Sequence, residues 1–220
     1  VVRAESRRHY VDLVSTKKGK FETVSFVVNK HNPVISSSNS SLAKGGEQVG
    51  RVKRKPRESG YKNWDDSLTL SFCGPAPAVQ RIRIEPDTTA TTVYLCGNST
   101  VVDQEDEPWA SWGQMITRWF DTDVVIANFA ESGLSCTSFL AQLRLDKILS
   151  QLKRGDYVIV EFGHNDEKEK QPGDGAWYSY SRNLKIFVDR VRAAGGHIIF
   201  CTPTARRFFN DDRQTIQNTH

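Results

Sequence analysis

The chain has 220 residues, a formal net charge of +4, 38% hydrophobic residues and 25% charged residues. This composition is typical of a soluble globular protein with one large or two small domains, long enough to bury a substantial core. No stretch approaches the ~20 apolar residues of a membrane span, so we expect none. The small net charge argues against a nucleic-acid partner, because such proteins usually carry a denser basic stripe with interleaved aromatic residues.

The chain starts at Val1 without a methionine or an apolar signal segment, which predicts a mature or trimmed product. Its four cysteines lack the C-x-x-C spacing that is typical of metal sites. Cys96 and Cys201 each end an apolar run, so we expect buried thiols there rather than metal ligands. Disulfide pairing stays open at this stage.

Residues 10–84 show short alternating apolar runs between turn-rich polar segments, without a 3.6-residue period. We expect them to form a small β-sandwich, an accessory domain over residues 1–88. The expected strands are 21–28, 48–52, 67–72 and 79–84. The basic cluster Arg51-Val52-Lys53-Arg54-Lys55-Pro56-Arg57 is interpreted as an exposed strand rather than a nucleic-acid site, and an acidic polysaccharide would also suit it.

The pattern of apolar residues changes after residue 88, where short apolar runs alternate with helix-length amphipathic segments. We expect an α/β domain over residues 89–220, with a flavodoxin-like parallel sheet between two helical layers. Near-continuous apolar strands indicate a sheet that is covered on both faces. The expected strands are 93–96, 124–127, 157–162 and 197–201, and the expected helices are 109–120, 138–152 and 182–194.

Three short polar blocks follow successive strands of this domain: Gly97-Asn98-Ser99-Thr100, Glu131-Ser132-Gly133 and Gly163-His164-Asn165-Asp166. The carboxyl ends of parallel strands meet at one edge of a sheet, where ligands bind. Ser99 could attack a carbonyl there, and the Gly133 amide and Asn165 side chain could hold the resulting oxyanion. Taken singly, these residues have other readings: Ser99 as a helix cap, Gly133 as a loop glycine and Asn165 as an Asx-turn. Their occurrence together and in this order favours ester hydrolysis.

The ordered blocks resemble those of the GDSL/SGNH hydrolases, and residues 92–207 resemble the rhamnogalacturonan acetylesterase branch, carbohydrate esterase family twelve. The matching segments are Val101-Val102-Asp103-Gln104, Glu107-Pro108-Trp109, Trp112-Gly113-Gln114, Ala130-Glu131-Ser132-Gly133, Arg144-Leu145-Asp146-Lys147 and Lys153-Arg154-Gly155-Asp156-Tyr157. The N-terminal half resembles the accessory β-sandwich of some relatives more loosely, through Asn63-Trp64-Asp65-Asp66 and residues 72–77.

This resemblance implies that Ser99 is the nucleophile, and that Ser99 N–H, Gly133 N–H and the Asn165 side chain form the oxyanion hole. It implies a serine esterase that removes acetyl groups from a pectin-type polysaccharide through an acyl-enzyme, without a metal or organic cofactor. His164 would shape the substrate site. The polysaccharide substrate implies a secreted, periplasmic or cell-surface location. Asn98 replaces the Asp of the G-D-S pattern; that Asp is not the general base, so we expect little effect.

The sequence departs from the family in its last block, because none of the five histidines follows an Asp in the D-x-x-H spacing of the triad. His197 begins a strand and His220 is the final residue. We therefore expect the α/β domain to be incomplete at its C-terminus. An inactive esterase homologue or a carbohydrate-binding protein is the alternative. A nucleotide or phosphate binder is a third reading, disfavoured because the Ser99 turn lacks the glycine run of a phosphate cradle.

Overall fold

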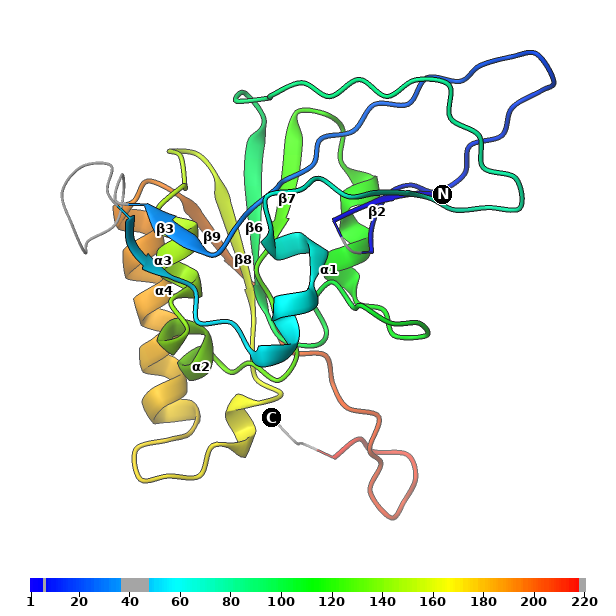
Figure 1. Ribbon diagram of the computed structural model, residues 1–220. Coiled ribbons are helices and arrows are strands. Elements are labelled where there is room, and N and C mark those ends of the chain that lie inside the picture. The colour runs from blue at the N-terminus through cyan, green and yellow to red at the C-terminus, as the bar shows by residue number, and fades with distance from the viewer. Residues whose placement is uncertain (6, 37–47, 218–220) are drawn as a thin grey trace.

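The computed structural model describes residues 1–5, 7–36 and 48–217. At its centre lies a sheet of four parallel strands in the order β7-β6-β8-β9 (Figure 1). The strands are β6 (Thr91–Gly97), β7 (Val124–Asn128), β8 (Tyr157–Glu161) and β9 (His197–Phe200). Segments rich in the β-branched residues valine, isoleucine and threonine form them, because such side chains pack well on a pleated surface. The predicted parallel α/β sheet is confirmed.

Alternate residues of β6 enter two separate apolar cores, one on each face of the sheet. Val93 and Leu95 pack on one face, and Tyr94 and Cys96 pack on the other. Helical elements cover both faces (Figure 1). The first face carries α1 (Trp112–Met115) and the 3₁₀ turn η3 (Ile116–Trp119), and the second carries α2 (Cys136–Ala141), α3 (Arg144–Leu149) and α4 (Ser181–Ala193). The predicted three-layer arrangement is confirmed.

The single helix predicted over 138–152 is wrong, because the chain forms two helices, α2 and α3, with Leu143 between them. Leu143 has a left-handed backbone, with φ of 62°. The carbonyl of Gln142 accepts a hydrogen bond from the backbone amide of Lys53, at 2.9 Å, instead of continuing the helical ladder. A contact distant in sequence therefore divides a segment whose apolar spacing favours one helix.

The helix predicted over 109–120 starts later, at Trp112, behind the N-cap residue Ser111. The Gln114 side chain accepts from the Ser111 amide at 3.3 Å, which closes a capping box around the first turn. Other short turns are η1 (Pro56–Gly60), η2 (Lys62–Trp64) and η4 (Asp166–Lys168), all 3₁₀, and the π turn η5 (Ala176–Tyr180).

The N-terminal part forms two small antiparallel sheets. One has the order β2-β1-β5, and the other pairs β3 with β4. Their bounds are β1 (Val2–Ala4), β2 (Arg8–Val11), β3 (Val34–Ser36), β4 (Gln48–Arg51) and β5 (Leu70–Phe72). The antiparallel β character is confirmed, whereas a sandwich of two facing sheets is not. The division of the chain at residue 88 stays a prediction.

The strands predicted at 21–28 and 79–84 are wrong. Both segments run without strand pairing, and the regions around them project from the body of the molecule (Figure 1). Phe21 is 70% exposed and Ile84 is 66% exposed. Alternation of apolar residues favours a strand only where one face finds a layer to cover it, and these side chains stay exposed.

Two buried ion pairs join the N-terminal part to the α/β sheet. Arg8 of β2 lies 3.2 Å from the Asp103 carboxylate and donates to the backbone carbonyl of Ile126 in the edge strand β7, at 3.3 Å. Arg144 of α3 donates to both carboxylate oxygens of Glu58 in η1, each at 2.6 Å. All four charged side chains are almost fully buried, so the two parts share one interior.

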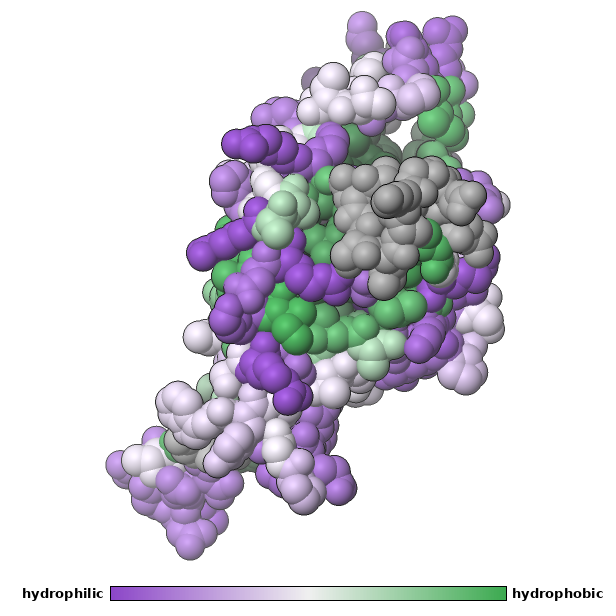
Figure 2. All heavy atoms as spheres, turned by 90° about the vertical axis from the view of Figure 1, so that its left-hand side faces the viewer, coloured by the Kyte–Doolittle hydropathy of each residue, from purple (hydrophilic) through white to green (hydrophobic). Residues whose placement is uncertain are grey.

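β9 lies at the other edge of the parallel sheet and is less covered than expected. Ile198 packs on the core beside α4, whereas Ile199 and Phe200 are each 44% exposed. Seen from the side of α4, apolar surface gathers near the middle of the molecule with polar side chains around it (Figure 2). The cysteines are free; Cys96 is buried as expected, and Cys201 is half-buried. None of the helices in the described part of the chain combines the length and apolarity needed to cross a bilayer.

Acidification below about pH 6.5 is expected to destabilise the fold through His31. Its ring lies against Trp64 and Phe129, with centroid separations of 4.4 Å in both contacts. Burial is the main reason that the pKa of His31 lies well below its usual value, and nearby cations such as Arg8 lower it further. The unfolded chain therefore binds a proton that the folded chain excludes. This contribution to the unfolding free energy is present above pH ~6.5 and falls on acidification by up to about 1.4 kcal/mol per pH unit.

Urea unfolding measured from about pH 7.5 down to about pH 5 checks this prediction. His31→Phe removes the titrating group, so its unfolding free energy should fall less on acidification than that of the parent protein. Equal slopes in the two proteins would contradict it.

Candidate active site

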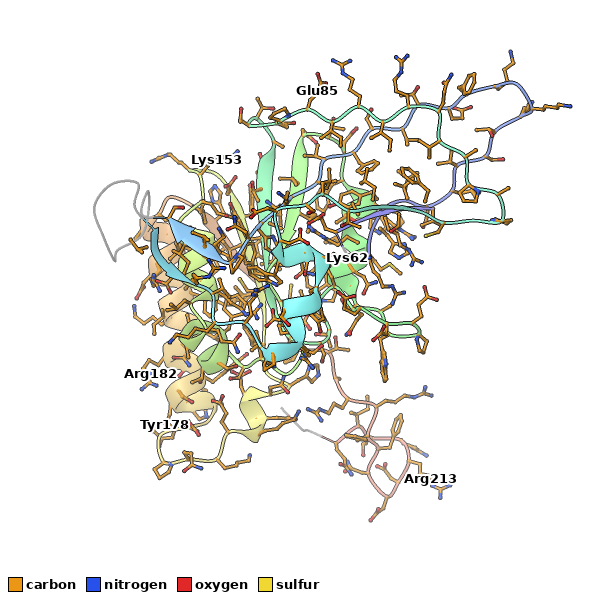
Figure 3. All side chains as sticks on the ribbon, in the orientation of Figure 1. Lys62, Glu85, Lys153, Tyr178, Arg182 and Arg213 are labelled. Carbon is orange, nitrogen blue, oxygen red and sulfur yellow. The ribbon has the colours of Figure 1, made fainter. Side chains whose placement is uncertain are left out.

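The three polar blocks meet at the carboxyl edge of the parallel sheet. The ladder pairs Leu95 of β6 with Asn128 of β7, and Gly97 of β6 with Glu161 of β8, so the three strands end side by side. In Figure 3, Glu85 and Lys153 lie at the opposite edge, whereas Tyr178 and Arg213 lie toward the edge where these strands end. The topology therefore brings together blocks that are more than 30 residues apart in the chain.

Ser99 is exposed in a tight turn directly after β6. The Asn98 carbonyl accepts from the amides of Val101 and Val102, both at 3.0 Å, which folds the chain back immediately. The Asn98 side chain, rather than that of Ser99, accepts the next amide of the turn, from Thr100 at 3.1 Å. Ser99 is therefore not the cap of this turn. Its hydroxyl and its amide have no hydrogen-bond partner among the described residues.

A glycine is required at the end of β6 for this turn to form. A Cβ on Gly97 would lie 2.4 Å from Val101 Cγ2 and 3.0 Å from the Glu161 carbonyl oxygen. Such contacts are far shorter than van der Waals distances, so any side chain would push the Ser99 turn away from β8.

The second block wraps over the end of β6. The Glu131 amide donates to the Gly97 carbonyl at 3.2 Å. Gly133 has φ of 78°, a left-handed conformation that glycine adopts without strain. Its amide has no acceptor within the described ranges. Burial, followed by the neighbouring Glu58, raises the pKa of the Glu131 carboxyl, and the paired Arg57 opposes this shift.

The third block contacts the second through Asn165. The Asn165 side-chain amide donates to the Leu134 carbonyl at 2.9 Å, directly after Gly133, and its oxygen accepts from Lys168 Nζ at 2.9 Å. This contact spans 31 residues, so the side chain is oriented by the second block and not by an Asx-turn. The second hydrogen of this amide group has no acceptor in the part of the chain that the structure describes, so it is available to a ligand.

Asp166 holds the third block in place through two hydrogen bonds from backbone amides. One carboxylate oxygen accepts from the Cys136 amide at 2.7 Å, and the other accepts from the Gly163 amide at 3.0 Å. Burial raises the pKa of Asp166, while these backbone hydrogen bonds lower it. The carboxylate thus ties the loop after β8 to the start of α2.

Glu161 is a site residue that sequence analysis missed. It ends β8 in a buried position and accepts from Thr100 Oγ1 at 2.5 Å and from Trp112 Nε1 at 2.7 Å. It therefore ties the Ser99 turn to β8 and α1. The sequence could have indicated this role, because Glu161 is a single carboxylate at the end of an otherwise apolar strand. A buried carboxylate needs hydrogen-bond donors around it.

The histidines lie in different parts of the molecule. His164 Nε2 lies 2.8 Å from the Thr204 carbonyl oxygen, which ties the third block to the segment after β9. His9 and His31 are buried in the N-terminal part. His197, at the start of β9, packs against Tyr157 of β8 with tilted rings whose centroids are 4.9 Å apart. His220 lies outside the described residues. Within the described ranges, no group of three or more His, Cys, Asp or Glu side chains is arranged to hold a metal ion.

A family model described as GDSL-like lipase/acylhydrolase matches residues 95–219, more than half of the chain. The chain belongs to this family. The match starts in β6 and includes all three polar blocks, so the resemblance inferred from those blocks is confirmed.

Two relatives of this GDSL family member are named rhamnogalacturonan acetylesterases. One, from Bacillus subtilis, is 36% identical over 129 residues, which cover 58% of this chain and 54% of the relative. The other, from Emericella nidulans, is 34% identical over 106 residues, 44% of this chain and 41% of the relative. The chain thus spans about half the length of the curated relatives it matches. A crystal structure of the Bacillus subtilis protein YxiM aligns with a TM-score of 0.48 at 25% identity, covering 66% of this chain and 39% of that one.

Proposed function

We propose that this protein is a serine esterase that removes acetyl groups from a polysaccharide, with Ser99 as its nucleophile. The observation that carries the proposal is the pair of unpaired amides at Ser99 and Gly133, beside the oriented Asn165 side chain. Donors without protein acceptors at one sheet edge suit an oxyanion that forms only during the reaction. Membership of the acylhydrolase family supports the same chemistry.

In the proposed reaction, Ser99 Oγ bonds to the acetyl carbonyl carbon while its proton passes to a general base. The carbonyl oxygen becomes an oxyanion, held by Ser99 N–H, Gly133 N–H and Asn165 Nδ2–H. Collapse of this intermediate breaks the ester bond, and the sugar oxygen leaves with a proton. Water then attacks the acetyl-enzyme, which releases acetate and restores Ser99. Each oxyanion donor is expected to contribute about 10²–10³ in rate.

The proposed substrate is an acetylated pectin-type polysaccharide, and His164 is proposed to contact it. The names of the relatives support this class of substrate. His164 suits the role because it follows β8 at the same edge as Ser99. Pectin-type polysaccharides are found outside the cell, so we propose a secreted, periplasmic or cell-surface location.

Acetate release distinguishes the proposed substrate from other esters. The protein, as its source produces it, is assayed on acetylated rhamnogalacturonan, acetylated xylan and p-nitrophenyl acetate. We expect the largest kcat/KM on rhamnogalacturonan and none after chemical deacetylation. Equal values on all three esters would contradict the substrate class.

Binding to rhamnogalacturonan without acetate release would instead favour an inactive homologue or a carbohydrate-binding protein.

A further inference from the structure

Two cations from the N-terminal part contact the same backbone oxygen in the second block. Lys55 Nζ and Arg57 Nη2 both donate to the carbonyl oxygen of Ser132, the latter at 2.6 Å. Both residues belong to the basic cluster at 51–57, which lies 75 to 77 residues earlier in the chain and outside the region that matches the family. The exposed strand that the sequence predicts over this cluster is therefore wrong: only Arg51 belongs to a strand, β4, and Pro56 and Arg57 begin the turn η1.

The Ser132 carbonyl and the Gly133 amide belong to one peptide group. This group is planar and trans, so its C=O and N–H point in opposite directions. Cations that hold the oxygen therefore fix the direction of the N–H. Hydrogen bonds from charged donors also polarise the peptide, which makes the N–H a stronger donor.

A glycine at position 133 leaves this peptide free to rotate unless other groups hold it. Lys55 and Arg57 together form a clamp on its oxygen. Gly133 has φ of 78°, and a residue without Cβ can rotate the preceding peptide at little cost. Rotation would turn the Gly133 N–H away from the direction that the proposed oxyanion hole requires. The clamp prevents this without a side chain on residue 133, where a Cβ would lie 3.2 Å from Lys55 Nζ.

The arrangement is unfavourable as a stabilising device alone. Burial, followed by the like charge of Arg57, lowers the pKa of Lys55. Arg57 is partly neutralised by its ion pair with Glu131, while its side chain stays 49% exposed. Two cations converging on one neutral oxygen cost electrostatic energy, so a role in positioning accounts for them better than a role in stability.

We propose that Lys55 and Arg57 are positioning residues that aim and polarise the Gly133 amide as an oxyanion donor. The catalytic part of this inference rests on the proposed esterase function. The orientation of the Ser132–Gly133 peptide does not, and it can be measured separately.

Kinetics of three variants test the catalytic part. Lys55→Met is expected to lower kcat by about 10- to 100-fold with KM changed less than about twofold, because it weakens one oxyanion donor without removing it. Lys55→Arg keeps a charged donor and should recover most of kcat. Lys53→Met is the matched control, since it removes the same charge from an exposed neighbour in the cluster, and its kcat should equal that of the parent. A raised KM with unchanged kcat in Lys55→Met would overturn the proposal in favour of substrate binding.

The amide proton and nitrogen chemical shifts of Gly133 test the structural part in a Ser99→Ala background, where catalysis plays no role. We expect Lys55→Met to move this resonance upfield and Lys53→Met to leave it in place. An unchanged chemical shift of Gly133 in Lys55→Met would overturn the clamp even if the protein is an esterase. A shifted resonance in a protein without esterase activity would retain the clamp and reject the proposed function.

Discussion

Ser99→Ala is expected to abolish acetyl-ester hydrolysis while leaving the fold intact. Without the hydroxyl no acetyl-enzyme can form, and serine hydrolases that lose the nucleophile typically lose about 10⁴–10⁶ in kcat. Ser99 is exposed and its hydroxyl has no partner among the described residues, so the unfolding free energy should change by less than about 0.5 kcal/mol. Acetate release and urea unfolding measure the two effects.

Ser67→Ala is the matched control for this experiment, because Ser67 is an exposed serine far along the chain from the polar blocks. It should retain full activity. Intact mass after rapid quenching should find an acetyl group on the parent protein and none on Ser99→Ala. Acetate release by Ser99→Ala at the parental rate would identify a different nucleophile and reject the assignment.

Arg144→Met is expected to lower the unfolding free energy by about 3–5 kcal/mol. The change leaves the Glu58 carboxylate buried without its bidentate partner, and it removes the donor to the Phe129 carbonyl, at 3.0 Å. Neither group can reach water, because Glu58 and Phe129 are both fully buried. Urea unfolding of the single variant measures the loss.

A double variant separates the lost partner from the lost packing. Glu58→Gln removes the charge but keeps an acceptor for the Lys55 amide, which Glu58 now binds at 2.6 Å. Combined with Arg144→Met, it should recover part of the stability that the single variant loses, because no unpaired charge remains. A double variant as unstable as the sum of both single variants would show that the pair is not energetically coupled.

Most of the α/β fold could be predicted because its signals are local. Each strand of the sheet is a short apolar run, and α4 (Ser181–Ala193) is an amphipathic segment followed by Gly195, which has φ of 85°. The errors occur where distant contacts decide. The Lys53 amide ends α2 by taking the Gln142 carbonyl, and nothing in residues 138–152 encodes that partner.

The site was predictable to the extent that topology determines it. Parallel strands end at one edge, so the convergence of the blocks of Ser99, Gly133 and Asn165 follows from the order of strands and helices. Their catalytic roles stay predictions. Lys55 and Arg57 could not be placed, because a basic cluster has no intrinsic partner, and its contacts with the second block depend on how the N-terminal part packs.

The buried ion pairs between the two parts of the chain also bear on how the protein folds during synthesis. Arg8 needs the Asp103 carboxylate as its counter-ion and the Ile126 carbonyl, 118 residues further along, and Glu58 needs a guanidinium 86 residues further along. Residues 1–88 therefore leave the ribosome well before the groups that neutralise their buried charges exist. Closing such long loops is slow, as in other proteins of high contact order. The N-terminal half can complete these buried contacts only after β7 and α3 have been synthesised, so folding cannot proceed strictly from the first residue to the last.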